Sequence, residues 1–145
     1  MSEHLREFYP PVRTLMGPGP ANVHPRVLQA MTMPLLGHLD PDFLRVMDDV
    51  RGALAQVWQS REGFAIPVSG TGTAGMEAAL CNVLEPGDTA LVCVNGFFGE
   101  RLADIAARCG ATVARVEFPW GQPVDPERVE EALKALPRVK AVAMV

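Results

Sequence analysis

The sequence predicts a domain of the α/β class, in which helices flank a mostly parallel sheet. Two observations lead to this prediction. From residue 63 onward short apolar runs alternate with helical segments, and glycine- and proline-containing turns separate them. Strand–helix–strand units with short apolar strands form right-handed crossovers that place neighbouring strands parallel. The 145 residues, 48% of them hydrophobic, are enough to bury a sizeable core.

The chain divides into three segments. Residues 1–23 form a proline-rich N-terminal arm, in which Gly17-Pro18-Gly19-Pro20 favours a stiff, non-helical backbone. Residues 24–62 form a helical segment that leads into the large domain. Residues 63–145 form the first part of that α/β domain. Because the chain stops at KAVAMV in the middle of an apolar pattern, we expect the remainder of the domain to be absent.

Two helices are expected in the helical segment. The first covers HPRVLQAM, with Asn22 as its N-cap and Pro25 in its first turn. The second spans about 41–59 and begins after Asp40 as N-cap with Pro41 at its first position. Its apolar residues recur at three- and four-residue steps, the pattern of a helix that packs on a core.

Four strands and three helices are expected to alternate in the α/β domain. The strands are FAIPV, TALVCV, ATVARVEF and VKAVAMV, and the helices cover about 73–84, 98–109 and 126–136. Gly110 closes the second of these helices, and Asp125 caps the third.

Composition excludes several classes of function. Thirteen basic against seventeen acidic residues give a net charge of −4, which argues against a nucleic-acid or anionic-membrane surface. No apolar run reaches the roughly 20 residues of a membrane span, and the N-terminus lacks the apolar centre of a signal peptide, so we expect a cytoplasmic protein.

The cysteines and histidines do not show the spacing of metal ligands, so no metal site is predicted. Cys81, Cys93 and Cys109 each lie among apolar residues and contain no CxxC pair. We therefore expect them to be buried small hydrophobic residues in a reducing compartment.

The segment from Ser69 to Gly75 is a candidate phosphate-binding loop. A strand that leads through a glycine- and threonine-rich turn into a helix leaves backbone amides free at the positive end of the helix dipole. The hydroxyls of Thr71 and Thr73 add donors, so a dianionic phosphate would fit. The alternative is an ordinary turn with a threonine N-cap.

Gly70, Gly72 and Gly75 also match the dinucleotide-binding pattern G-x-G-x-x-G. That reading requires an acidic residue about 20 positions later for the ribose, but the second strand ends in Val-Asn-Gly. A nucleoside-triphosphate loop is excluded because Gly-Lys-Ser/Thr does not occur.

Five motifs in order resemble the class V aminotransferases: LMGPGPANVHPRVL, GHLDPDF, SGTGTAGMEAAL, EPGD and VNGFFGER. The resemblance is to the alanine–glyoxylate and serine–glyoxylate branch, whose enzymes have fold type I and use pyridoxal 5′-phosphate. It runs from about residue 14 to residue 145. The family's fold then implies that these residues are the N-terminal part of the large domain, with an incomplete sheet.

The resemblance implies roles for residues at the matching positions. Thr71, Gly72 and Thr73 occupy the phosphate cup, and Phe98 matches the aromatic residue that stacks on the pyridine ring. Core packing is the alternative for Phe98. Gly17 and Gly19 match the arm that lines the substrate end of the pocket.

Two further polar residues, His38 and Glu77, are candidates for roles near these positions. His38 matches a segment near the boundary of a homodimer whose active site lies between subunits, and a surface position is its alternative. Glu77 is expected to hydrogen-bond neighbouring loop amides.

The family's reactive groups are implied to lie beyond residue 145. These are the lysine that binds the cofactor covalently, the acid beside the pyridine nitrogen and the arginine that binds the substrate carboxylate. Lys134 and Lys140, the only lysines, are expected to be solvated surface residues. No catalytic residue is therefore assigned within this chain.

Family sheet order places the first strand beside the seventh and the second between the third and fourth. Without its partner the first strand would expose an apolar edge, so we expect the chain not to fold alone. For the full-length protein the resemblance implies transamination between alanine or serine and glyoxylate. The alternatives are a purine-pathway glyoxylate aminotransferase, a cysteine desulfurase or lyase, and a non-enzymatic anion-binding fragment.

Overall fold

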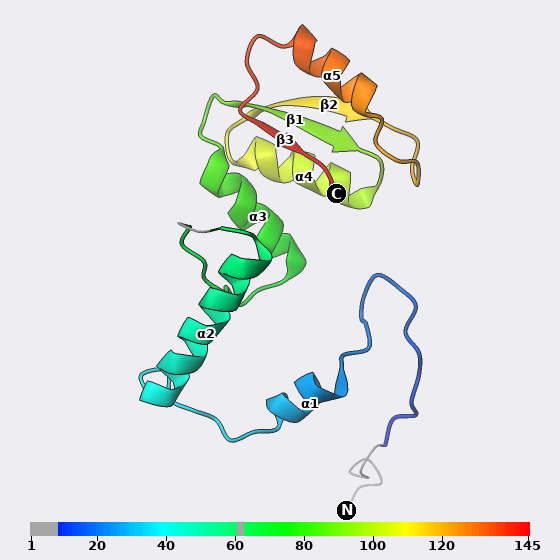
Figure 1. Ribbon diagram of the computed structural model, residues 1–145. Helices are drawn as coiled ribbons and strands as arrows, with labels where there is room; N and C mark the ends of the chain where they lie inside the picture. Colours follow the sequence, from blue (N-terminus) through cyan, green and yellow to red (C-terminus); the bar gives the residue numbers. More distant parts are fainter. Residues whose placement is uncertain (1–8, 61–62) are drawn as a thin grey trace, which may run out of the picture. The chain divides into compact units, whose positions relative to one another are not determined.

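Residues 9–60 and 63–145 are described in the computed structural model, and the chain divides into two compact units after Pro67. We call residues 1–67 the N-terminal unit and residues 68–145 the sheet unit. Figure 1 shows the helices and strands of each unit.

The N-terminal unit contains both predicted helices, α1 (Pro25–Met31) and α2 (Pro41–Val57). As predicted, Asp40 caps α2: its carboxylate accepts a hydrogen bond from the Asp42 amide at 2.8 Å. The expected cap of α1 was wrong. His24 caps it through Nδ1, which accepts from the Arg26 amide at 3.2 Å. The Asn22 side chain instead accepts from the Leu15 amide and donates to the Arg13 carbonyl.

Neither α1 nor α2 has a buried residue among those described, so the predicted packing of α2 on a core is not seen. The predicted stripe is present, because Phe43, Met47 and Leu54 are the half-buried apolar residues of α2 with large side chains. Its partner surface does not lie within the described residues of this unit. Most large apolar side chains of the unit are exposed instead.

The sheet unit contains a three-stranded parallel sheet of order β2-β1-β3. The strands are β1 (Thr89–Val94), β2 (Thr112–Glu117) and β3 (Ala141–Ala143), with Val92 opposite Arg115 on one side and Ala143 on the other. The α/β class and the parallel sheet are thereby confirmed. The strand order also matches the expectation that TALVCV lies between the two strands that follow it.

The predicted strand FAIPV is wrong, since residues 63–68 adopt no strand in this structure. An extended segment becomes a strand only when a neighbouring strand accepts and donates its backbone hydrogen bonds. The neighbour expected for this segment was a strand beyond residue 145. The described residues therefore form three strands instead of four.

Helices α4 (Phe97–Arg108) and α5 (Pro126–Ala135) lie on opposite faces of the sheet, and α3 (Gly72–Val83) packs beside α4. Alternate residues of β1 point to opposite faces, as the two-residue period of a strand requires. Ala90, Val92 and Val94 pack with α3 and α4, whereas Leu91 and Cys93 pack on the side of α5. These helices lie within one residue of their predicted bounds (Figure 1).

Two glycines fix the position of α4. A Cβ at Gly99 would lie 2.9 Å from Val94 Cα and 3.0 Å from the Cys93 carbonyl oxygen, so only glycine allows the helix to approach β1 this closely. Gly110 ends the helix with a φ of +84° and accepts a hydrogen bond from the Gly87 amide at 2.9 Å. The predicted helix end at Gly110 is confirmed.

The expectation that all three cysteines are buried holds only for Cys93, which lies in the centre of β1. Cys81 is exposed on α3, and Cys109 is half-buried at the end of α4. Apolar neighbours in sequence do not bury a residue when the helix turns it away from the sheet.

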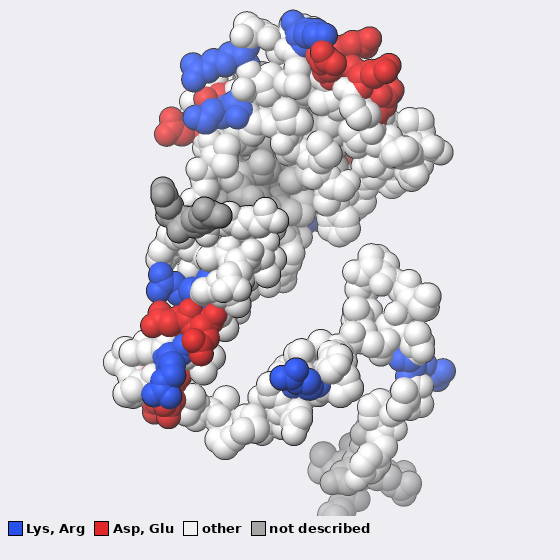
Figure 2. All heavy atoms as spheres, viewed as in Figure 1, with Lys and Arg blue, Asp and Glu red and all other residues white. Residues whose placement is uncertain are grey.

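Acidic and basic side chains are interspersed on the face shown in Figure 2, over α2 and over the sheet unit. Several of them form ion pairs along one helix, such as Arg45–Asp42, Arg108–Asp104 and Lys134–Glu130. No helix among residues 9–60 and 63–145 is long and apolar enough to cross a bilayer.

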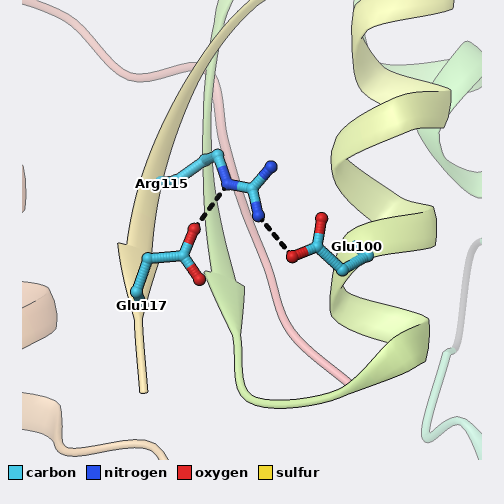
Figure 3. Close-up of polar contacts among 3 residues, drawn as sticks. All are labelled: Glu100, Arg115 and Glu117. Carbon is cyan, nitrogen blue, oxygen red and sulfur yellow. Dashed lines mark hydrogen bonds and ion pairs between the residues drawn. The ribbon is translucent and has the colours of Figure 1, made fainter. Parts of the chain in front are cut away.

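One ion cluster links α4 to β2 (Figure 3). Arg115 donates from Nη2 to Glu100 on α4 at 2.6 Å, and from Nε to Glu117 on its own strand at 2.7 Å. Hydrogen bonds to these two carboxylates raise the pKa of the Arg115 guanidinium, so it stays charged. The cluster is partly exposed and therefore contributes little to stability.

Candidate active site

The amino end of α3 presents backbone donors at the predicted phosphate loop. Thr71 is the N-cap: its hydroxyl oxygen accepts from the Ala74 amide at 3.2 Å, and its carbonyl accepts from the Gly75 amide at 3.0 Å. Within the described residues no protein group accepts a hydrogen bond from the amides of Thr71, Gly72 or Thr73. Because these amides lie at the positive end of a twelve-residue helix, they can bind an anion.

Space around this turn suits a bulky anion. A Cβ placed on Gly72 would meet no heavy atom within 4 Å, so the backbone there is open on its outer side. Thr71 and Gly72 are exposed, and Thr73 is half-buried. A phosphate group can therefore approach the amides directly, and the Thr71 hydroxyl can still donate its hydrogen while its oxygen caps the helix.

Phe98 lies in the first turn of α4, and its side chain is 49% exposed. Its ring meets that of Phe97 edge to face, with 5.5 Å between centroids and 80° between planes. Phe98 is therefore not part of the core that the described residues form. The ring offers an accessible face on which a flat heterocycle could stack.

A groove of about 420 Å³ lies between α3, which carries the Thr71–Thr73 turn, and α4, which carries Phe98. Thr73, Glu77 and Cys81 line it from α3, and Arg101, Ile105 and Cys109 line it from α4. The two helices meet near their carboxyl ends, where Cys81 Sγ lies 2.9 Å from Cys109 Sγ, and they run in the same direction in Figure 1. Their amino ends, which carry the Thr71–Thr73 turn and Phe98, therefore lie at the same end of the sheet unit.

Arg101 is a residue of this region that the sequence analysis missed. Its guanidinium carbon lies 5.2 Å from the Phe97 ring centroid, and its side chain lines the groove together with Thr73. The four-residue spacing between Phe97 and Arg101 is a signal for this contact, because such residues share one face of a helix. Arg101 adds positive charge near the amino end of α3.

The prediction for Glu77 was wrong. It hydrogen-bonds no loop amide among the described residues, although the amides of Thr71, Gly72 and Thr73 have no other protein acceptor there. Glu77 instead lines the groove between α3 and α4.

The predicted substrate-side residues lie in the N-terminal unit. Gly17, Gly19 and His38 are all exposed, and a Cβ on either glycine would meet no heavy atom within 4 Å. His38 lies in the turn that ends where the Asp40 amide donates to the Gly37 carbonyl at 3.0 Å. Nothing in the geometry of this unit tests their role, which stays a prediction.

Comparison with known proteins gives these features a context. No family model matches the chain. It is 43% identical over 130 residues to alanine–glyoxylate aminotransferase from Drosophila melanogaster, covering 90% of this chain and 33% of that protein. It is 42% identical over 140 residues to (S)-ureidoglycine–glyoxylate transaminase from Bacillus subtilis, covering 97% of this chain and 33% of that enzyme.

Solved structures that resemble this chain are also aminotransferases. Alanine–glyoxylate aminotransferase from Nostoc sp. superimposes with a TM-score of 0.86 at 47% identity, covering 97% of this chain and 37% of the other. Pyridoxamine–pyruvate aminotransferase from Mesorhizobium loti superimposes with a TM-score of 0.78 at 27% identity, covering 86% of this chain and 31% of the other.

The fold is that of an N-terminal portion of the solved aminotransferase structures, which belong to fold type I. Within that fold the chain is homologous to the class V aminotransferases, and its relatives include enzymes named for transfer to glyoxylate. It spans about a third of the length of the curated relatives that it matches.

Proposed function

We propose that the full-length protein is an aminotransferase that uses pyridoxal 5′-phosphate and transfers an amino group to glyoxylate. The observation that carries this proposal is the amino end of α3, where the amides of Thr71, Gly72 and Thr73 have no protein acceptor among the described residues. Relatives named as alanine–glyoxylate aminotransferases, at 43% and 47% identity, support the reaction class.

The residues present fit the cofactor in a specific way. Thr71, Gly72 and Thr73 would hold its phosphate through backbone amides and hydroxyls, and the dipole of α3 would favour the negative charge. Phe98 would stack on the ring. When bound, pyridoxal phosphate supplies an electron sink and a carrier for the amino group. These residues bind and orient, and no catalytic residue is proposed among residues 1–145.

For the amino donor we propose a small amino acid, alanine or serine. Gly17 and Gly19 would line the substrate end of the pocket, where the absence of side chains leaves room. His38 would lie near the subunit boundary of a cytoplasmic homodimer. A second donor, ureidoglycine, is favoured by one observation: the Bacillus subtilis relative that is named for it matches 97% of this chain.

The full-length protein tests the proposal in two steps. Added pyridoxal phosphate should give the visible absorbance of the lysine-bound cofactor, and borohydride reduction should fix it to one lysine-containing peptide. Steady-state assays with glyoxylate and a panel of alanine, serine, ureidoglycine and cysteine should then show amino transfer.

Three results would redirect the assignment. Saturable phosphate binding without cofactor absorbance would indicate a non-enzymatic anion-binding protein. Release of sulfide from cysteine would indicate a desulfurase instead of an aminotransferase. Activity only with ureidoglycine would place the enzyme in purine breakdown.

A further inference from the structure

Two thiols meet between α3 and α4, away from the proposed cofactor turn. Cys81 Sγ, in the last turns of α3, lies 2.9 Å from Cys109 Sγ, at the C-cap of α4. The two residues are 28 positions apart in the chain, and the parallel packing of the helices brings them together. Neither residue takes part in the function proposed above.

The surroundings of the pair allow a small reagent to reach it. Cys81 is exposed, Cys109 is half-buried, and both line the groove of about 420 Å³. The third cysteine differs sharply: Cys93 is fully buried in β1, and burial raises the pKa of its thiol. The chain thus contains an accessible thiol pair and one inaccessible thiol that serves as an internal control.

We propose that Cys81 and Cys109 are a redox modification site, at which a hydroperoxide converts the two thiols into a reversible intramolecular disulfide. A disulfide needs an S–S distance of about 2.05 Å, so the two sulfur atoms must approach each other by less than about 1 Å. Such a shift is within the range of side-chain rotation.

The chemistry balances with hydrogen peroxide as the oxidant. The Cys81 thiolate attacks one peroxide oxygen, the O–O bond breaks, and the departing hydroxide takes a proton to become water. Cys109 sulfur then attacks the sulfenic sulfur of Cys81, the S–O bond breaks, and the Cys109 proton leaves with the hydroxide as a second water. Two thiols are oxidised to one disulfide, and a thiol reductant reverses the step by exchange.

The groups around the pair set its pH dependence. The pKa of the Cys109 thiol is raised, first by its hydrogen bond with Cys81, then by burial and by the charge of Glu77. Arg101, Asp104 and Arg108 also line the groove from α4, and Arg108 is paired with Asp104 at 2.9 Å. Because Cys109 stays protonated at neutral pH, it can supply the proton of the second step. Oxidation should accelerate as the pH rises and more thiolate forms.

A peptide map of the full-length protein tests the proposal. The protein is treated with hydrogen peroxide, blocked with N-ethylmaleimide, and digested with trypsin together with a protease that cleaves before aspartate. Trypsin alone is insufficient, because residues 62–101 form one tryptic peptide that contains both Cys81 and Cys93. Cleavage before Asp88 separates peptide 62–87, which contains Cys81, from Cys93, and the expected product is a cross-link between peptides 62–87 and 109–115, lighter by two hydrogen atoms and lost on reduction.

Three variants complete the experiment. Cys93→Ser should leave the cross-link unchanged, whereas Cys81→Ser and Cys109→Ser should each abolish it. A link from Cys93, a link between two protein molecules, or oxidation of Cys81 that stops at the sulfinic acid would each overturn the proposal. A cofactor-free preparation should give the same cross-link, so the result does not depend on the proposed transamination.

Discussion

Thr71 and Thr73 lie two residues apart in the same turn, yet their side chains serve different purposes. The Thr71 hydroxyl oxygen accepts from the Ala74 amide and so caps α3, whereas the Thr73 hydroxyl makes no such bond among the described residues. Substitutions at the two positions should therefore separate stability from cofactor binding.

At Thr71 we expect an effect on stability. Thr71→Ala removes the N-cap and should lower the unfolding free energy by about 1 kcal/mol, whereas Thr71→Ser should keep most of it. Denaturant melts of full-length protein without cofactor measure the difference. Equal stability of the two variants would show that this hydroxyl does not cap the helix in solution.

At Thr73 we expect an effect on affinity. Thr73→Val keeps the shape of the side chain but removes a donor, and a hydrogen bond to a charged group is worth about 1.5–3 kcal/mol. Pyridoxal phosphate should then bind roughly tenfold more weakly, or worse, with an unchanged melting temperature of the cofactor-free protein. Fluorescence titration with the cofactor measures this, and unchanged affinity would remove Thr73 from the phosphate site.

Phe98 allows a test of ring stacking. Phe98→Leu should weaken cofactor binding by about 0.5–1.5 kcal/mol, whereas Phe98→Trp should bind at least as tightly because it offers a larger face. The same titration gives both values. If leucine and tryptophan variants bind alike, the exposed ring has no role in holding the cofactor.

At the scale of elements, α4 depends on a close approach to β1 at Gly99. Gly99→Ala places a methyl group 2.9 Å from Val94 Cα, and backbone atoms cannot move aside without shifting the helix. We expect a loss of about 1–3 kcal/mol in unfolding free energy. Gly52→Ala in α2 is the matched control, since its methyl group meets no atom within 4 Å and a helical glycine is replaced.

The link between α4 and β2 through Arg115 should matter much less. Arg115→Met breaks both ion pairs, but the charges are partly exposed, so the loss should stay below about 1 kcal/mol. Urea melts at low and high salt should show the wild-type advantage shrinking as salt increases. A cost as large as that of Gly99→Ala would mean that the cluster is more deeply buried in the full-length protein.

Elements with local signals could be predicted from the sequence. Asp40-Pro41 and Asp125-Pro126 mark the starts of α2 and α5, because a cap and its helix are neighbours in the chain. The cap of α1 could not be predicted this way, since the Asn22 side chain hydrogen-bonds the backbone of Arg13 and Leu15 instead. The strand predicted at FAIPV was wrong for a related reason. Its apolar pattern is that of a strand, but a strand forms only when a neighbouring strand, distant in sequence, pairs with it.

The candidate site also contains features with a local sequence signal and features that depend on contacts between distant residues. The amino end of α3 was predicted because the glycine- and threonine-rich turn and the helix that follows it are contiguous in sequence. The Cys81–Cys109 contact and the groove were not, because they depend on the register in which α3 packs beside α4. That register follows from the sheet order, which no local pattern contains.

At the scale of the whole molecule, many large apolar side chains among residues 9–60 and 63–145 are exposed. Val12, Leu35 and Met16 are among the most exposed, and the described residues of α1 and α2 bury nothing. We expect residues 1–145 expressed alone not to fold cooperatively, unlike the full-length protein. Circular dichroism melts and size-exclusion chromatography decide this, and a compact monomer with a sharp thermal transition would contradict it.

β1 contributes to both cores at once, with Ala90 through Val94 fully enclosed and a hydrogen-bonded neighbour on each side. No local fluctuation can bring its amides to water without separating both helical layers from the sheet. In deuterated buffer the full-length protein should therefore retain protium longest along 90–94. Its rate of exchange there would report the opening of the entire α/β body, whereas the amides of the Thr71–Thr73 turn would exchange early and slow down only when an anion is added.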